Sequence, residues 1–197
     1  MHKIVVANQK GGVGKTTTTV NLAACIAELG YRVLVVDFDP QANATSALGI
    51  DPRSIEKSTY DVILNDVNLR DCIIKSQWES LSVAPSNLNL AGAEIELVSA
   101  FNRERLLDGA ISSVISEYDF VLIDCPPSIG LLTVNALTAA SEVLVPIQCE
   151  YLALEGLGQL LSNVERVKTH LNKELHISTI ALVMFDARTK LAGQVVE

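Results

Sequence analysis

The amino-acid sequence predicts a three-layer α/β fold, in which helices flank both faces of a mostly parallel, twisted sheet. Short runs of β-branched residues alternate with helical stretches along the chain of 197 residues, and such alternation is typical of crossover units. Aromatic residues are only 5% of a chain that is 49% hydrophobic, so Ala, Val, Ile and Leu must fill the core. Aliphatic strands of this kind suit a sheet that is buried on both faces.

The predicted strands are short apolar runs that end at turn or polar residues. The run at 81–84 stops at Pro85, and the run at 120–123 leads directly into Asp124. Both signals mark the end of a strand. The full set of predicted strands is residues 4–7, 33–36, 72–74, 81–84, 120–123, 143–146 and 177–184.

Helices are predicted where apolar residues recur at intervals of three and four. In the first helix Val20, Ala23 and Ala27 share one face, and Gly30 supplies the C-terminal stop. The predicted helices are residues 16–29, 60–64, 103–115, 131–140, 154–171 and 189–196. The last has neither a cap nor a following strand. We therefore expect residues 1–197 to form a single domain whose C-terminal part is missing.

Composition excludes several classes of protein. Fifteen Lys and Arg against 23 Asp and Glu give a net charge of −8, which excludes a globally basic nucleic-acid binder but not a local basic patch. No apolar run approaches the roughly 20 residues of a membrane helix, and no signal peptide is recognisable. The four widely spaced cysteines are expected to be reduced, buried thiols of a cytosolic protein.

The most specific motif is KGGVGKTT at residues 10–17, between the first predicted strand and the first predicted helix. Its glycines lack Cβ, so the backbone can curl and direct N–H groups at phosphate oxygens. The following helix adds the positive end of its dipole. Lys15 would bridge the β- and γ-phosphates, and the Thr16 hydroxyl would bind Mg²⁺. The predicted nucleotide-binding residues are Lys10, Gly11, Gly12, Val13, Gly14, Lys15, Thr16 and Thr17.

One departure from the general phosphate-loop pattern is informative. GxxxxGK[ST] requires a glycine five residues before Gly14, where this chain has Gln9. The sequence instead fits KGGxGK[ST], with the additional Lys10 at its start. The motif therefore predicts a P-loop NTPase fold of the deviant Walker A type.

Aspartates follow two of the predicted strands. Asp37 and Asp39 come after residues 33–36, and Asp124 comes after residues 120–123. In open α/β sheets ligands bind outside the carboxyl ends of the strands, so these carboxylates should meet the phosphate loop there. Asp124 would hold Mg²⁺ directly or through water. Asp39 would orient or deprotonate the attacking water, and Asp37 would brace the loop.

Five segments together resemble the ParA/Soj family of the MinD/ParA superfamily, over the chain from residue 3 to the end. They are NQKGGVGKTTTTVNLAA, VLVVDFDPQANAT, DFVLIDCPPSIGLLTVNAL, VPIQCEYLALEGL and MFDARTKL. The resemblance implies a cytoplasmic, nucleoid-associated partitioning ATPase that uses ATP and Mg²⁺. ATP would drive a sandwich homodimer in which the catalytic Lys10 reaches the partner's nucleotide. Asp39 would be the second catalytic residue, as the candidate for activating water.

The same resemblance implies partners. The ATP dimer would bind double-stranded DNA without sequence preference, and a ParB-type centromere-binding protein would stimulate an otherwise weak hydrolysis. Arg188 matches the family position implicated in DNA binding, and Lys190 lies two residues further on, so both could contact phosphates. No membrane partner is expected. Ala42 departs from the glycine that is common in this family at its position.

Three alternatives use the same scaffold. A MinD-like membrane-cycling ATPase would need a C-terminal amphipathic helix, which this sequence does not reach. A small-molecule enzyme such as a dethiobiotin synthetase would need a carboxylate pocket that no residues clearly build. An iron–sulfur relative would need cluster ligands, but the positions of Cys125 and Cys149 do not fit them.

Overall fold

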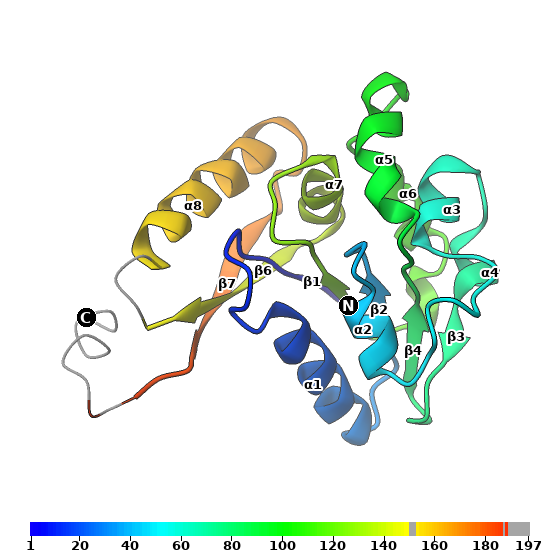
Figure 1. Cartoon of the computed structure of the whole chain (residues 1–197), viewed down its shortest axis with the longest axis horizontal. Helices are drawn as coiled ribbons and strands as arrows, with labels where there is room; N and C mark the ends of the chain where they lie inside the picture. Colours follow the sequence, from blue (N-terminus) through cyan, green and yellow to red (C-terminus); the bar gives the residue numbers. More distant parts are fainter. Residues whose placement is uncertain (150–152, 187, 189–197) are drawn as a thin grey trace.

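A computed structural model describes residues 1–149, 153–186 and 188 (Figure 1). Within these residues the strands form one sheet of seven, in the order β3-β4-β2-β5-β1-β6-β7. Neighbouring strands are parallel except β3 and β4, which are antiparallel. The strands are β1 (His2–Val6), β2 (Val33–Asp37), β3 (Ile74–Lys75), β4 (Leu81–Ala84), β5 (Phe120–Asp124), β6 (Glu142–Gln148) and β7 (His176–Val183).

Helices cover both faces of this sheet (Figure 1). One face packs against α1 and α2, and the other packs against α3, α5, α6, α7 and α8. The helices are α1 (Lys15–Glu28), α2 (Asn43–Ala47), α3 (Thr59–Leu64), α4 (Leu69–Cys72), α5 (Leu90–Glu96), α6 (Leu106–Ser112), α7 (Leu131–Ala139) and α8 (Ala153–His170), with 3₁₀ turns at Leu97–Ser99 and Ile115–Glu117.

Alternate residues of the central strands enter two separate apolar cores. In β2, Val33 and Val35 pack with Ala23 of α1, whereas Leu34 and Val36 belong to the core beneath α5, α6 and α7. All of β2 is buried. Because side chains alternate across a strand, an aliphatic run without polar interruptions is what a sheet covered on both faces requires. The predicted three-layer, mostly parallel architecture is confirmed.

The register of the strands places the phosphate loop and the carboxylates of Asp37 and Asp124 at one edge of the sheet. β5 lies between β1 and β2, and Asp124 is level with Val6 on one side and with Asp37 on the other. The loop after β1, the loop after β2 and the end of β5 therefore start from adjacent positions. This is the carboxyl edge at which open α/β sheets bind ligands.

Several predicted boundaries are wrong. The helix predicted at 103–115 begins only at Leu106, and the strand predicted at 72–74 is replaced by the end of α4 followed by β3. The helices α2, α4 and α5 were not predicted from the sequence. The predicted helix at 189–196 lies outside the described residues. None of the described helices combines the length and the apolar character needed to cross a lipid bilayer.

The cysteines are free thiols, but they do not share one environment. Cys72, Cys125 and Cys149 are buried, and Cys25 is exposed on α1. The expectation of buried thiols is therefore wrong for Cys25. Burial raises the pKa of the Cys125 thiol well above its usual value, which keeps it protonated.

Candidate functional site

The loop between β1 and α1 has the backbone that its glycines predict. Gly12 and Gly14 have φ angles of +75° and +78°, a region that side chains disfavour and glycine enters freely. A Cβ at Gly11 would meet no atom within 4 Å. The loop ends at α1, whose first backbone N–H groups have no partners within the helix. These N–H groups and the helix dipole make the loop suited to phosphate.

Asn8 braces this loop from below, a role that we did not predict from the sequence. Its buried amide donates to the carbonyl of Pro146 at 2.7 Å, and its Oδ1 accepts from the backbone N–H of Lys10 at 3.0 Å. The start of the loop is thereby tied to β6. Only the position of Asn8, directly after the strand and before the glycines, could have indicated this role.

Lys15 lies inside the curl of the loop. Its side chain is buried, and Nζ donates to the carbonyl of Lys10 at 3.0 Å. Loss of hydration lowers the pKa of this ammonium, while the nearby charges of Asp124 and Asp39 act in the opposite direction. The loop therefore holds a partly desolvated cation close to two carboxylates.

Asp124 meets the first turn of α1. Its Oδ2 accepts from the Thr16 hydroxyl at 2.7 Å, and its Oδ1 accepts from the Thr19 hydroxyl at 3.2 Å. Burial raises the pKa of the Asp124 carboxyl to about 7, and the charges of Asp37 and Asp39 add to this rise. Thr16 and Asp124 present hard oxygen ligands side by side, which suits a Mg²⁺ that keeps several of its waters.

Asp39 and Asp37 occupy the loop after β2. The Oδ1 of Asp39 accepts from the backbone N–H of Gln41 at 2.9 Å, and its side chain is almost completely buried. Asp37 is fully buried and accepts from the backbone N–H of Asp39 at 3.2 Å. Burial raises the pKa of the Asp37 carboxyl to about 6, although hydrogen bonds from Thr45 oppose the rise.

These loops enclose one cavity of about 350 Å³. The cavity brings together the phosphate loop, the loop after β2 and the turn after β5. Its lining consists of Gly11, Gly12, Gly14, Lys15, Thr16, Thr17, Asp39, Gln41, Asn43, Pro127 and Met184. The arrangement can hold a polyphosphate against backbone N–H groups and Lys15, with a carboxylate beside it.

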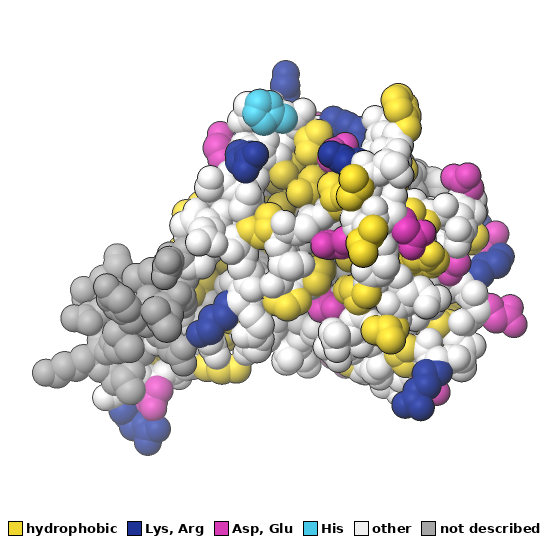
Figure 2. All heavy atoms as spheres, turned by 45° about the horizontal axis from the view of Figure 1, so that its top comes forward, with side chains coloured by type: hydrophobic (Ala, Val, Ile, Leu, Met, Phe, Trp, Pro, Cys, Tyr) yellow, Lys and Arg dark blue, Asp and Glu magenta, His cyan; other side chains and the backbone are white. Residues whose placement is uncertain are grey.

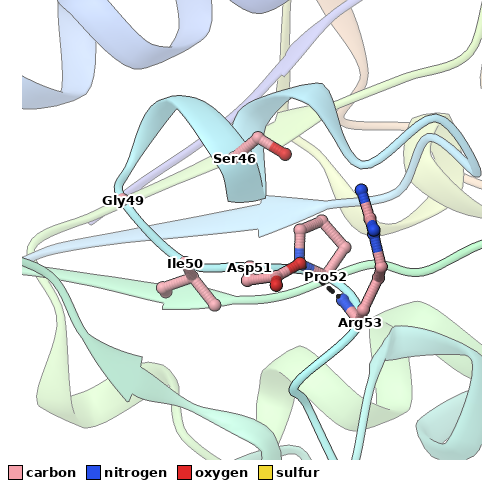
Figure 3. A pocket seen from close by; sticks show the side chains of 6 residues that line it. All are labelled: Ser46, Gly49, Ile50, Asp51, Pro52 and Arg53. Atoms are coloured by element: carbon pink, nitrogen blue, oxygen red, sulfur yellow. Dashed lines mark hydrogen bonds between the residues drawn. The ribbon is translucent and has the colours of Figure 1, made fainter.

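A second hollow lies on the outer side of α2 (Figure 3). It measures about 480 Å³, and its ionisable lining residues are Asp51 and Arg53. The Asp51 carboxylate accepts a hydrogen bond from the backbone N–H of Arg53 at 3.0 Å. This carboxylate caps its own turn, so we assign no chemistry to this hollow.

Comparison with known proteins identifies the family. Residues 1–177 match a family model described as an AAA domain. The chain is 55% identical over 198 aligned residues to the sporulation initiation inhibitor protein Soj of Bacillus subtilis, covering 100% of this chain and 78% of that protein. It is 50% identical to the chromosome partitioning protein ParA of Myxococcus xanthus, covering 98% and 69%. The chain belongs to the Soj/ParA family.

A solved structure agrees with this assignment of the fold. The cobyrinic acid a,c-diamide synthase of Mycobacterium smegmatis, crystallised with ADP and magnesium, is 42% identical and has a TM-score of 0.94. The match covers 100% of this chain and 80% of that one. The resemblance to P-loop ATPases predicted from the motifs is confirmed.

This Soj/ParA protein has an unusual backbone conformation at Ala42, beside the site. Ala42 precedes α2 with φ +52°, in the left-handed region. An L-residue with a Cβ pays about 1–2 kcal/mol for that conformation. A glycine would avoid this cost. The side chain of Ala42 is buried.

Of the two residues predicted to bind DNA, the structure describes Arg188. The exposed Arg188 guanidinium makes two hydrogen bonds to the Asp186 carboxylate, at 2.7 and 2.9 Å. A DNA phosphate would have to compete with that carboxylate. Lys190 lies outside the described residues. On the face shown in Figure 2, Lys and Arg side chains are scattered among acidic and apolar ones.

Proposed function

We propose that this Soj/ParA protein is a DNA-partitioning ATPase, with residues 1–197 acting as one P-loop ATPase domain. The observation that carries the proposal is the convergence of the phosphate loop, Asp39 and Asp124 at the carboxyl edge of the sheet. The relative from Myxococcus xanthus is named a chromosome partitioning protein, and a structural neighbour was crystallised with ADP and magnesium. Hydrolysis of ATP to ADP and phosphate is the reaction that fits this site.

Each residue of the site has a chemical task. The N–H groups of residues 11–17 and the Lys15 ammonium bind the β- and γ-phosphates. Thr16 and Asp124 hold Mg²⁺, which neutralises phosphate charge when bound. Asp39 accepts a hydrogen bond from the attacking water and orients it toward the γ-phosphate.

Lys10 acts in the dimer. Two copies meet with their phosphate loops facing each other, and the Lys10 ammonium of one copy approaches the nucleotide of the other. There it stabilises the charge that develops on the transferred phosphoryl group, in the manner of an arginine finger. Hydrolysis is then weak until a ParB-type protein completes or orders the site.

Dimerisation also links ATP to DNA. A chain with a net charge of −8 gains affinity for DNA when two copies place Arg188 and Lys190 on a common face. The dimer binds duplex DNA without sequence preference, and hydrolysis releases it. The protein is thereby cytoplasmic and nucleoid-associated, without a membrane partner.

The name of the 42% identical neighbour supports a second candidate, an ATP-dependent amide synthase. That chemistry needs a binding site for an organic carboxylic acid beside the γ-phosphate. We favour partitioning because the relative named a chromosome partitioning protein is more similar to this chain, at 50% identity.

Retention on DNA separates the two candidates. We would use the full-length protein carrying Asp39→Ala, so that bound ATP persists, and pass it over non-specific duplex DNA with ATP, with ADP and without nucleotide at two salt concentrations. Retention only with ATP, lost at the higher salt, is expected for counterion release. No retention in any state would leave the partitioning proposal without support and favour the small-molecule enzyme.

A further inference from the structure

A buried polar cluster lies beneath the loop that carries Asp39. It consists of Asp37, Thr45, Thr59 and Ser86, all with 0% exposure. None of the four lines the cavity at the phosphate loop. The cluster joins the end of β2, the middle of α2, the start of α3 and the segment that follows β4.

Thr45 is the centre of this cluster. Its backbone N–H and its hydroxyl both donate to Oδ2 of Asp37, each at 2.7 Å. The same hydroxyl oxygen accepts from the backbone N–H of Ser86 at 2.9 Å. Thr59 adds a further link, because its hydroxyl donates to the backbone carbonyl of Asp37 at 3.0 Å. One hydroxyl therefore connects the loop after β2 with the segment after β4.

The cluster holds the Asp39 loop at both ends. Upstream, Oδ1 of Asp37 accepts from the N–H of Asp39 itself. Downstream, the backbone N–H of Ala42 donates to the carbonyl of Asp39 at 2.9 Å, and α2 then leads to Thr45. The Asp39 side chain thus projects from a short turn whose two ends are fastened to the same buried carboxylate.

Closing a turn with a buried carboxylate has a high cost in desolvation free energy. All three hydrogen bonds to Asp37 come from neutral N–H and O–H groups, and transfer of a carboxylate out of water costs several kcal/mol even when it is hydrogen-bonded. Neutral side chains could close the same turn at lower cost. A role in fixing the geometry of the turn that carries Asp39 would explain why the carboxylate is present.

We propose that Asp37 and Thr45 form a positioning pair that fixes the Asp39 carboxylate in the nucleotide site. This rests on the proposed role of Asp39 in orienting water. Since orientation errors of about 1 Å can cost on the order of 100-fold in rate, loosening the pair lowers turnover. Nucleotide affinity depends on the phosphate loop and changes little.

The test is a comparison of three variants at and beside Thr45. Thr45→Val has nearly the same shape but lacks the hydroxyl, and Thr45→Ser retains it. Ser46→Ala is the matched control, because the Ser46 hydroxyl donates to the carbonyl of Ala42 on the outer side of α2. For each we would measure kcat, the Kd for Mg·ATP and the melting temperature, using the full-length protein.

We expect Thr45→Val to lower kcat by roughly 10- to 100-fold and to change the Kd by less than about threefold. Thr45→Ser should stay within about threefold of the wild type in both, and Ser46→Ala should resemble the wild type. Wild-type turnover by Thr45→Val would overturn the proposal. So would an equal loss of affinity and turnover, or a Thr45→Ser variant as impaired as Thr45→Val.

A second variant covers the case in which Thr45→Val does not fold. Asp37→Asn can keep an oxygen toward Thr45 but turns an NH₂ group toward the N–H of Asp39, so it disturbs Asp39 specifically. It too should lower kcat more than affinity, and unchanged kcat would overturn the proposal. Asp39→Ala separates the positioning role of Asp37 and Thr45 from the role of Asp39 in orienting water. If this variant hydrolyses ATP at the wild-type rate, the proposed role of Asp39 fails as well.

Discussion

Replacing Asp124 by Asn should stabilise the nucleotide-free protein, and increasingly so as the pH rises. The carboxyl is fully buried and its pKa is raised to about 7, against about 3.9 in an unfolded chain. Because the folded-state pKa is the higher one, the stabilising contribution of the protonated carboxyl is complete below about pH 4 and is lost as the pH rises through 7.

The size of the effect follows from these two values. One unit of pKa difference is worth about 1.4 kcal/mol, so the raised pKa of Asp124 costs the wild type about 1.5 kcal/mol at pH 5, where the folded carboxyl stays protonated, and about 4 kcal/mol at pH 8, where it is ionised. Asn does not ionise, so the variant has neither cost. Its oxygen can accept from the Thr16 hydroxyl, and its NH₂ can donate to Thr19, whose own proton can then be donated to the carbonyl of Lys15.

Urea unfolding without nucleotide or Mg²⁺, at pH 5, 6, 7 and 8, measures this difference. The advantage of Asp124→Asn should grow by about 2–3 kcal/mol from pH 5 to pH 8. Asp71→Asn removes an exposed carboxylate and serves as the control for the loss of one negative charge. A gap between Asp124→Asn and wild type that is the same at pH 5 and pH 8 would refute the reasoning.

Three further predictions test other parts of the site. Lys15→Ala should abolish nucleotide binding in equilibrium titration, whereas Lys3→Ala, a partly exposed lysine, should not; tight ATP binding by the first would overturn the loop assignment. Ala42→Gly should raise the free energy of unfolding in urea by up to about 1 kcal/mol, since it relieves the left-handed strain, while Ala44→Gly within α2 should lower it by about 1 kcal/mol; destabilisation by both would contradict the strain argument. Arg188→Glu should weaken ATP-dependent retention on DNA without preventing dimerisation. Arg32→Glu, from a similar exposed pair with Asp119, is its control, and equal retention of both would place the DNA site elsewhere.

The sheet and the phosphate loop were predictable because their determinants are local. An uninterrupted aliphatic run such as β2 has few alternatives to a strand buried on both faces. The left-handed backbone at Gly12 and Gly14 is likewise predictable from the residue type, because glycine adopts positive φ angles without steric cost. Here the sequence pattern and the structure express the same physical constraint.

The two boundary errors have different causes. The helix predicted from residue 103 starts late because α7, distant in the chain, holds the preceding segment: Asn135 donates to the carbonyl of Arg103 and accepts from the N–H of Leu107. Periodicity within the segment cannot identify that partner. The strand predicted at 72–74 loses Cys72 to α4, whose start is capped by the Asn68 side chain, a local signal that our prediction did not use.

The cluster beneath Asp39 was missed because its contacts, too, are distant in the chain. Thr45 and Ser86 are 41 residues apart in the chain, and only the pairing of β2 with β4, which sets Val36 level with Ala84, brings them together. In sequence Thr45 is one of several threonines, with no spacing that marks it. The importance of such a residue follows from topology, so it becomes visible only after the strand order is known.

Electrostatic interactions connect the carboxylates after β2 and β5 with the phosphate loop. The charge of Asp39 raises the pKa of the Asp37 carboxyl, and the charges of Asp37 and Asp39 together raise the pKa of the Asp124 carboxyl, with Lys15 as the nearby cation. Repulsion among these carboxylates makes the nucleotide-free site unfavourable, and a divalent cation held by Thr16 and Asp124 relieves it. A polyphosphate alone would add negative charge to a site that already has an excess of it. The arrangement therefore favours joint binding of metal and nucleotide over either one alone.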